Sequence, residues 1–532
     1  MDYYIGKICD ATQPMTFIRV FAILILADKE MTIFEFVDNG ICDQELPVTG
    51  GRSLAPLSQS FDCIKTWGRL QQEAFDKWLW RIDVPFLTDG QDIIKFHRRA
   101  VLPFITRSTE QSNGLEDSDY SRVEPYMPGT GGYGEVSIVE IHPKCHNFQC
   151  RPGLQLHRPE GPFALKKLHP TRNRDIEKDF MNEVKMLRTF NGNVHPHIVT
   201  VLMAFKHGDR CCFLFPWADC DLLTYFETKT MPDMNITNFH WVAEQTLNIT
   251  EAVHHIHFPP GVDSLSPDMK LYGRHGDIKA ENILVFNEKN NPLLVLSDFG
   301  LGSMHHDWSK SMVPNRQIQA TPGFRPPECD MENGHISRAF DVWTLGCVFL
   351  DILIWLLGGE TLRRSFESDR MAASHPQGLQ TPTYFEVIQT DNGRFGFIIK
   401  EQVNKWFAEL HRHDRCTDFV HEFLELIQQR MLIVETQSEK RARTHDLVAS
   451  LKTLRDKALR DERYCLGANP YDRPSNVPTI AEGMLSEHAK RHITASHAIP
   501  RTVSGPTQLA EQTFEEGDVL IRDLRDRRDR RI

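Results

Sequence analysis

The sequence predicts an α+β fold in which a strand-rich region is followed by a helical one. From Val123 onward, strand-like apolar segments flank a glycine-rich turn. Much later, a nearly continuous apolar stretch follows Asp341, which is typical of a helix at the centre of a helical lobe. The polar segment Ser108 to Ser121 indicates a linker, so the first 120 residues form a region of their own.

Length, composition and charge limit the class of protein. The 532 residues are 40% hydrophobic and 25% charged, which is ordinary for a globular chain of two or three domains. The net charge of −11 argues against general binding to nucleic acid or to an anionic membrane. The twelve cysteines have no regular spacing and the first residues lack a basic signal segment. We therefore expect an intracellular protein, cytoplasmic or nuclear, with reduced thiols.

The first 120 residues predict a mixed domain without recognisable chemistry. Val20 to Ala27 and Met31 to Val37 are expected to be strands, whereas Phe61 to Trp80 has apolar residues at helical spacing. Its tryptophans are more often core residues than a partner surface. We hypothesise that this extension packs against the strand-rich region and either regulates it, through a regulatory partner, or recruits substrate.

A glycine-rich turn lies between the first two strands of the next region. Gly129, Gly131, Gly134 and Val136 fit the pattern GxGxxGxV, in which glycines let the backbone approach phosphate groups. The pattern is weak by itself, because a simple glycine hairpin has the same residues. A dinucleotide-binding turn is disfavoured, since a strand and not a helix follows it.

The next strand and helix carry a candidate ion pair. Lys166 ends the strand segment Phe-Ala-Leu-Lys, and Glu183 lies beside the apolar face formed by Phe180, Val184 and Leu187. A pair between Lys166 and Glu183 would hold the lysine on the α and β phosphates of a nucleotide. Taken alone, an edge-strand lysine would explain Lys166 about equally well, and a helix-surface glutamate would be the better explanation of Glu183.

A strand from Cys212 to Phe215 runs into Pro216, Trp217 and Ala218. We interpret these three residues as the hinge between two lobes, where backbone groups would bind adenine. By this register Phe215 would border the pocket behind the adenine.

The most informative segment is Tyr272 to Phe286, which is followed closely by an Asp-Phe-Gly triplet. Asp277 is the candidate base that orients a substrate hydroxyl, and Lys279 would neutralise charge on the transferring phosphate. Asn282 and Asp298 would hold magnesium through hard oxygen ligands. Single loop aspartates commonly cap turns, but that explanation is weak for four such residues in this order.

Two later segments extend the pattern. Thr321 to Glu328 ends in Pro-Pro-Glu, and Asp341 opens the apolar helix, where it is a natural N-cap that could brace the loop around Asp277. Glu328 is expected to form a structural ion pair with Arg441 or Arg443.

The region from Val123 to Leu459 resembles a eukaryotic protein kinase domain. The segments YGRHGDIKAENIL and FDVWTLGCVFLDILIWLLGG are similar to serine/threonine kinases of filamentous fungi that carry an N-terminal extension. The resemblance implies a bilobal kinase fold, with a small β-rich N-lobe containing one helix and a larger helical C-lobe. It also implies ATP and Mg²⁺ as cofactors. Lys279 and Thr321 match the pattern of kinases that phosphorylate serine or threonine hydroxyls of protein substrates.

The resemblance also divides the chain and adds contacts to the nucleotide. The parts are an N-terminal extension (1–120), an N-lobe (121–217), a C-lobe (218–459) and a C-terminal tail (460–532). Val136, Ala164 and Leu284 would contact ATP. The polar tail is expected to be largely disordered, with a helix near Val519 to Arg531. Its alternating arginines and aspartates favour a solvated helix face over a nuclear-localisation or RNA-binding segment.

The catalytic loop departs from the family pattern at Gly276, where most kinases have an arginine that meets a phosphate on the activation segment. Without this arginine, a phosphate there loses its main charge-assisted partner. We hypothesise that activity does not require phosphorylation of Ser303, Ser309 or Ser311.

A long insertion, at about Ile141 to Pro162, predicts an extended hairpin loop. It holds five potential zinc ligands, but their spacing matches no zinc finger, so a polar loop is favoured. These ligands are His142, Cys145, His146, Cys150 and His157.

The leading interpretation is an active serine/threonine protein kinase. Its main alternative is a pseudokinase or scaffold, which would have no physical need for the complete set of phosphate- and metal-binding candidates. A small-molecule kinase is disfavoured by the Thr321 to Glu328 segment and the Asp341 helix, which build a docking platform for a polypeptide.

Overall fold

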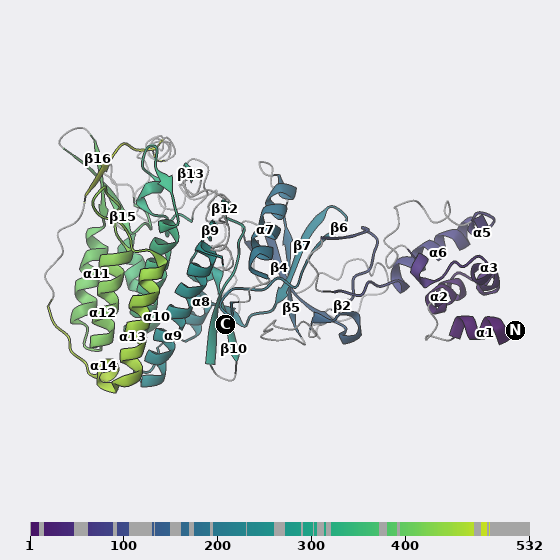
Figure 1. Ribbon diagram of the computed structural model, residues 1–532, viewed down its shortest axis with the longest axis horizontal. Helices are drawn as coiled ribbons and strands as arrows, with labels where there is room; N and C mark the ends of the chain where they lie inside the picture. The colour runs from purple at the N-terminus through teal and green to yellow at the C-terminus, as the bar shows by residue number, and fades with distance from the viewer. Residues whose placement is uncertain are drawn as a thin grey trace, which may run out of the picture. The chain divides into compact units, whose positions relative to one another are not determined.

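The chain forms two compact units in a computed structural model (Figure 1). The first unit comprises Met1–Phe180 and Val201–Trp217, and the second comprises Met181–Thr200 and Ala218–Ile532. The division after Trp217 falls within the predicted hinge. The structure describes residues 2–9, 15–46, 62–88, 93–105, 130–131, 134–148, 161–169, 175–191, 195–229, 231–259, 272–288, 291–301, 303–305, 313–314, 321–371, 380–390, 394–472, 480–486 and 489.

The first unit begins with a cluster of helices around their own apolar core. The core contains Phe36, Phe75 and Leu79, all buried. The cluster consists of α1 (Asp2–Cys9), α2 (Ile18–Leu26), η1 (Glu30–Thr32), α3 (Ile33–Asp38), η2 (Asp43–Glu45), α5 (Asp62–Lys65) and α6 (Arg69–Ile82).

The two strands predicted in this region are wrong, because their residues form α2 and α3. Val20, Ile23 and Leu24 of α2 are buried together, at the spacing that one helix face requires. Short apolar runs fit a strand or a buried helix equally well, and packing against α6 settles the choice here. The helix predicted from Phe61 to Trp80 is present, but it is interrupted between α5 and α6.

A sheet of seven described strands follows, in the order β1-β6-β7-β5-β4-β2, with β3 paired to β4 (Figure 1). Most pairs are antiparallel, but β1 runs parallel to β6, with Ile94 opposite Phe205. The strands are β1 (Ile94–Phe96), β2 (Phe104–Ile105), β3 (Thr130–Gly131), β4 (Gly134–Ile141), β5 (Phe163–Leu168), β6 (Met203–His207) and β7 (Arg210–Pro216), with the turn η3 (Pro143–Cys145) after β4. Because β1 and β2 precede residue 121, the boundary predicted there does not separate the extension from the sheet.

Two side chains connect the helical cluster to the sheet. Trp80 packs against both cores, and its ring stacks on His97 with centroids 4.4 Å apart. The carboxylate of Asp76 on α6 pairs with Arg99, which follows β1, at 2.5 Å. The extension therefore packs against the strand-rich region as predicted, and its regulatory role stays a prediction.

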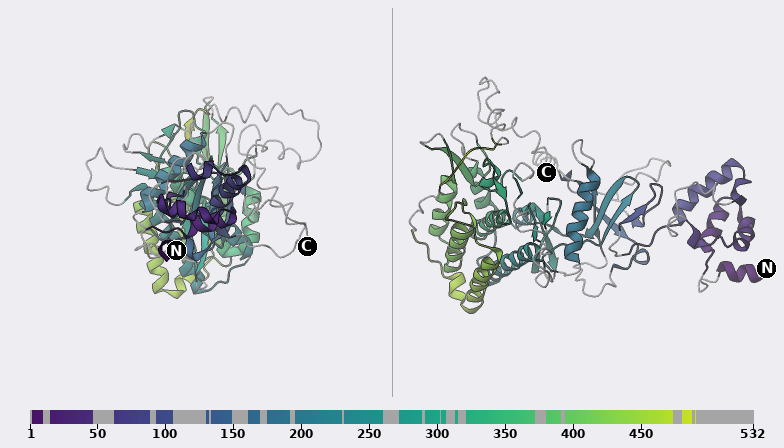
Figure 2. Two further views of the ribbon diagram at one scale, coloured as in Figure 1. Left: turned by 90° about the vertical axis from the view of Figure 1, so that its right-hand side faces the viewer. Right: turned by 45° about the horizontal axis from the view of Figure 1, so that its top comes forward.

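The second unit is mostly helical (teal to yellow-green in Figure 2), with α9 packed against α10 and α13, and α12 packed against the same two helices. Its helices and turns are the C-terminal part of α7 (Ile176–Asn191), α8 (Leu222–Thr228), α9 (Ile236–His257), η6 (Ala280–Asn282), η9 (Pro327–Cys329), α10 (Ala339–Arg370), α11 (Glu401–Arg412), α12 (Asp418–Leu426), the π-helical turn η10 (Ile427–Met431), α13 (Thr444–Arg460) and α14 (Glu462–Leu466).

Short strands complete this unit as small sheets. The strands are β8 (Cys220–Asp221), β9 (Tyr272–Arg274), β10 (Ile283–Glu288), β11 (Asn291–Leu296), β12 (Ser303–His305), β13 (Val313–Pro314), β14 (His335–Ile336), β15 (Phe385–Gln389), β16 (Phe395–Ile399) and β17 (Ala481–Gly483). With a strand-rich first unit and a helical second one, the structure confirms the predicted α+β class.

The central helix α10 is long and apolar enough to cross a membrane, yet its most apolar window is entirely buried within the fold. It bends at Gly359, whose φ of 68° is not helical. The apolar run therefore ends at the glycine pair, as predicted for a core helix.

The ordered fold continues past residue 459, where the tail was predicted to begin. Helix α14 follows directly, and β17 adds an edge to the β15–β16 sheet with Ala481 opposite Phe397. Ala481 and Leu485 are buried, which explains why this polar stretch joins the fold. The helix predicted near Val519 to Arg531 lies outside the described residues.

We predict that Phe96→Ala destabilises the sheet of the first unit. Phe96 is 9% exposed and its ring meets Phe205 edge-on at 5.6 Å, so truncation leaves a cavity that costs about 3 kcal/mol. Thermal unfolding would show a clearly lower transition. Phe86→Ala is the matched control, because Phe86 is 50% exposed and its loss should cost under about 0.5 kcal/mol. Equal shifts would refute the role of β1 in the sheet.

Candidate active site

The loop after β9 is held by one buried carboxylate, that of Asp341. It accepts hydrogen bonds from the backbone N–H of His275 at 2.8 Å and of Gly276 at 2.9 Å, and from Nε2 of His257 at 2.8 Å. Burial raises the pKa of Asp341, but the hydrogen bond from His257 and the nearby donors outweigh it, so the pKa is lowered overall. The group therefore acts as a charged acceptor at neutral pH.

This geometry confirms that Asp341 braces the catalytic loop and corrects the cap assignment. Helix α10 begins at Ala339, with Arg338 in the cap position, so Asp341 belongs to the first turn. Its oxygens are directed at the loop and not at its own helix. Sequence reasoning missed His257, whose only signal was a histidine at the end of the apolar helix α9.

Asp277 lies at the centre of the predicted catalytic residues. Its carboxylate accepts from the amide nitrogen of Asn282 at 2.7 Å and from the hydroxyl of Thr321 at 2.7 Å. The ammonium of Lys279 is 3.2 Å from Asp277 and donates to the Thr321 hydroxyl at 3.0 Å. Burial lowers the pKa of Lys279, but Asp277 and other carboxylates raise it more, so the ammonium stays charged.

The orientation of Asn282 suits a hard metal ion. Its amide nitrogen donates twice to Asp277, once to the carboxylate and once to the backbone oxygen, at 2.7 and 2.8 Å. With the nitrogen fixed there, the amide oxygen is directed elsewhere and is the type of ligand that Mg²⁺ prefers.

Asp298 occupies the strained turn that follows β11. Its φ is 60°, in the left-handed region that a non-glycine residue seldom adopts, which confirms the predicted strain. Ser297 ties this turn to the catalytic loop, because its N–H and its hydroxyl both donate to the carbonyl of Asn282 at 2.9 Å. The buried carboxylate of Glu183 also approaches this turn: a Cβ built on Gly300 would lie 3.8 Å from its Oε2.

His275 provides a further link that sequence reasoning did not single out. Its Nε2 donates to the carbonyl of Ser297 at 3.0 Å, and its ring lies 4.9 Å from that of Phe299. The catalytic loop and the Asp-Phe-Gly turn therefore hold each other in place.

Gly276 has a backbone conformation that disfavours a side chain. Its φ is 83°, and a Cβ there would lie 2.8 Å from the backbone oxygen of Leu301. The neighbouring Arg274 does not replace the arginine of the family pattern. Its guanidinium is buried, donates to the carbonyl of Ile336 at 3.4 Å and lies over the ring of Phe340.

The nucleotide-binding candidates of the first unit share one face of the sheet. Val136 is directly opposite Lys166, and Ala164 lies two residues before Lys166 on β5. Residues opposite each other, or two apart on a strand, point to the same face. Gly134 is required where it is, because a Cβ would lie 2.5 Å from the carbonyl of Lys167. Gly131 pairs opposite Gly134.

The other predicted ATP-binding residues are divided between the two units. Pro216 ends β7 and Trp217 donates its N–H to the carbonyl of Pro162 at 3.2 Å, whereas Ala218 begins the second unit. Leu284 lies on β10 opposite Asp221. Gly129 lies outside the described residues. The Lys166–Glu183 ion pair would join the two units and stays a prediction.

The expected structural ion pair forms with Arg441. Its guanidinium is fully buried and donates to both carboxylate oxygens of Glu328, at 2.6 and 2.9 Å. It also lies 4.8 Å above the ring of Trp343 on α10. Arg443, the alternative partner, is instead the N-cap residue of α13.

The predicted polar loop after β4 is only partly described. His142 caps the turn η3 by accepting the N–H of Lys144, and His146 is buried against Phe148 and Phe163. Cys150 and His157 lie outside the described residues. His146 therefore behaves as a core residue.

Comparison with known proteins agrees with this geometry. The family model described as "Protein kinase domain" matches residues 155–499, more than half of the chain. The chain therefore belongs to the protein kinase domain family, as predicted from its motifs.

Curated relatives include serine/threonine kinases of plants and fungi. A G-type lectin S-receptor-like serine/threonine-protein kinase SD1-1 of Arabidopsis thaliana is 29% identical over 47% of this chain and 26% of its own length. Serine/threonine-protein kinases SSN3 are 20% identical in Phaeosphaeria nodorum and 23% in Aspergillus niger, over 36% of this chain and 41% and 43% of theirs. The chain thus spans less than half the length of these relatives.

We predict that Gly276→Ala destabilises the catalytic loop. The left-handed φ and the close Leu301 oxygen together should cost about 1–3 kcal/mol of unfolding free energy and lower catalytic activity. Chemical denaturation would measure the loss. Gly483→Ala is the control, because its Cβ would meet Phe397 at an ordinary 3.7 Å. If both variants were as stable as the wild type, the proposed constraint at Gly276 would be wrong.

Proposed function

We propose that the protein transfers the γ-phosphate of ATP, bound with Mg²⁺, to serine or threonine hydroxyls of protein substrates. One observation carries the proposal: the Asp277 carboxylate accepts a hydrogen bond from the Thr321 hydroxyl while the ammonium of Lys279 lies beside both groups. A substrate hydroxyl would be oriented in the same way, with the lysine positioned to neutralise the transferring phosphate.

Each residue of the set has a distinct task. Asp277 accepts the hydroxyl hydrogen bond and orients the nucleophile. Lys279 supplies positive charge next to it. The oxygens of Asn282 and Asp298 would hold Mg²⁺, which neutralises phosphate charge when bound, and Lys166 would hold the α and β phosphates. Catalysis then depends mainly on positioning and on electrostatic stabilisation, because phosphoryl transfer needs little covalent help.

Serine or threonine specificity is supported by the contact between Lys279 and Thr321. Thr321 comes from the activation segment, so this segment and the catalytic loop meet at the place where the acceptor hydroxyl would bind. The names of the relatives point to the same acceptor class. A scaffold without catalysis is the competing function, but it gives no reason for this buried, hydrogen-bonded arrangement around Asp277.

The net charge of the chain and the packing of its N-terminal extension support proposals about its partners and its location. With a net charge of −11 we expect a protein substrate and neither nucleic acid nor membrane, in an intracellular, cytoplasmic or nuclear location. The N-terminal extension, fixed to the sheet through Trp80 and Asp76, is proposed to bind a regulatory partner or to recruit substrate.

We predict that Asp277→Asn and Asp298→Ala each abolish transfer of labelled phosphate from Mg-ATP to serine or threonine of a generic basic protein. Loss of the hydroxyl-orienting carboxylate should lower the rate by about 10²- to 10⁴-fold. Asp446→Asn, at an exposed position of α13, serves as the control and should keep full activity. A folded wild type that binds ATP but transfers no phosphate would favour the scaffold.

We also predict that alanine at Ser303, Ser309 and Ser311 together leaves activity within about twofold of the wild type, since Gly276 offers no charged partner for a phosphate. The backbone of Ser303 already pairs with Arg274 in the β9–β12 ladder, whereas Ser309 and Ser311 lie outside the described residues. Initial rates should be compared after phosphatase treatment of both proteins. An inactive triple variant that remains folded would show that phosphorylation is needed after all.

A further inference from the structure

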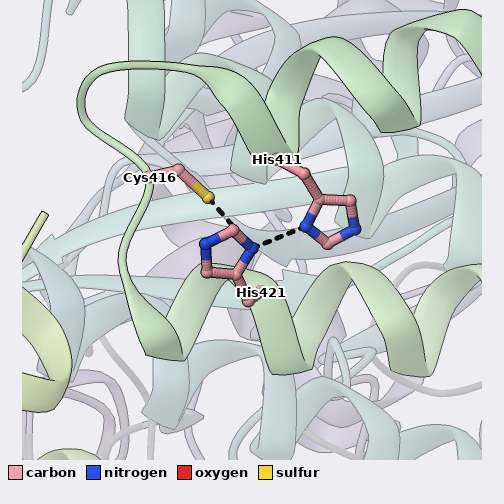
Figure 3. Close-up of side chains that lie close together, drawn as sticks. All are labelled: His411, Cys416 and His421. Carbon is pink, nitrogen blue, oxygen red and sulfur yellow. Dashed lines mark hydrogen bonds between the residues drawn. The ribbon is translucent and has the colours of Figure 1, made fainter. Parts of the chain in front are cut away.

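A second group of chemically reactive side chains lies in the second unit, between α11 and α12 (Figure 3). His411 is on the last turn of α11, Cys416 is in the connecting loop, and His421 is on α12. All three are buried, and one nitrogen or sulfur atom from each lies within 4.8 Å of the other two. None of them belongs to the catalytic set.

The tautomer of His421 follows from its surroundings. Its Nε2 is 2.8 Å from the backbone carbonyl of Asn469, and a carbonyl can only accept, so Nε2 carries the proton. In the neutral ring, Nδ1 then presents a lone pair. This Nδ1 is 2.6 Å from Nδ1 of His411 and 3.6 Å from the sulfur of Cys416.

This arrangement is the one that metal-binding histidines commonly have. One ring nitrogen is held by a backbone carbonyl, which fixes the ring, while the other faces the remaining ligands. The His421 Nδ1 lone pair accepts only one good hydrogen bond, yet both Nδ1 of His411 and the Cys416 sulfur lie within reach of it. A cation would satisfy all three groups at once.

We propose that His411, Cys416 and His421 bind one zinc ion. Two imidazole nitrogens and a thiolate are ligands that Zn²⁺ prefers, at about 2.0–2.1 Å for nitrogen and about 2.3 Å for sulfur. Around a tetrahedral ion these lengths place nitrogen and sulfur roughly 3.5 Å apart, close to the observed Cys416–His421 distance of 3.6 Å. The two histidine nitrogens have to separate by roughly 0.7 Å, and water would complete the tetrahedron.

The zinc ion would fasten the segment after α14 to the two helices. The backbone N–H of Asn469 donates to the carbonyl of Cys416 at 2.8 Å, and the backbone N–H of Tyr471 donates to the carbonyl of His411 at 3.2 Å. The Tyr471 ring covers His421 with centroids 4.1 Å apart. Binding the metal therefore stabilises the closure of α11, α12 and this segment, because zinc affinity is coupled to folding of its ligands.

The proposal is tested on the whole 532-residue chain, purified from zinc-supplemented medium and analysed for metal by mass spectrometry. We expect about one zinc per chain for the wild type. Cys416→Ser and His421→Asn should each lose most of it. Cys465→Ser is the matched control, because Cys465 is a buried thiol on the adjacent helix α14 and outside the cluster, so it should keep the metal.

Two measurements on the wild type keep the test decisive if a variant fails to fold. Replacing zinc with Co²⁺ should produce a near-ultraviolet thiolate-to-cobalt absorption band. Removing the metal with a chelator should lower the thermal unfolding temperature, and added zinc should restore it. A wild type without zinc or a cobalt band, copper in place of zinc, or variants that keep their zinc would each overturn the proposal. None of these readouts depends on kinase activity, so a failure of the zinc proposal can be distinguished from a failure of the proposed function.

Discussion

The buried carboxylate of Asp341 is the interaction on which the catalytic loop depends. Removing a charge from water costs several kcal/mol, and it is tolerated only where hydrogen bonds compensate. Here two consecutive backbone N–H groups and His257 do so. Because consecutive amides are fixed, the backbone at His275 and Gly276 has little freedom, and the direction of Asp277 follows. The position of Asp341 depends in turn on α10, which is buried along most of its length and is braced near its start by Arg441.

The candidate catalytic set could be proposed from sequence because its members are close together and because each has a required chemistry. Asp277, Asn282 and Asp298 were predicted from residue type, order and spacing, and the structure places the first two in direct contact. The choice between Arg441 and Arg443 could not be made from sequence. Two arginines two residues apart have the same charge, and only the burial of one of them against Trp343 distinguishes them.

The predictions that the structure contradicts concern interactions between segments that lie far apart in the sequence. Strands were predicted for α2 and α3 since a short apolar run carries no information about its partner. Here α2 packs against α6, and Phe36 of α3 contacts Phe75 of α6. The parallel pairing of β1 with β6 brings together residues more than a hundred positions apart, so a local sequence pattern cannot predict it. In the same way, cysteines and histidines are dense in sequence in the loop after β4, which made this loop the predicted candidate for zinc ligands. The group that converges in space is spread over a helix end, a loop and a second helix.

The same constraint explains why glycine suits position 276. The loop is held by Asp341 and is linked through His275 to Ser297, so its backbone at these positions is fixed by buried hydrogen bonds. The left-handed φ at Gly276 then favours the residue with no side chain, because a Cβ would meet the Leu301 oxygen. An arginine at this position would have to distort the loop in order to offer its charge to a phosphate. Buried hydrogen bonds to Asp341 therefore fix the backbone of this loop at His275 and Gly276.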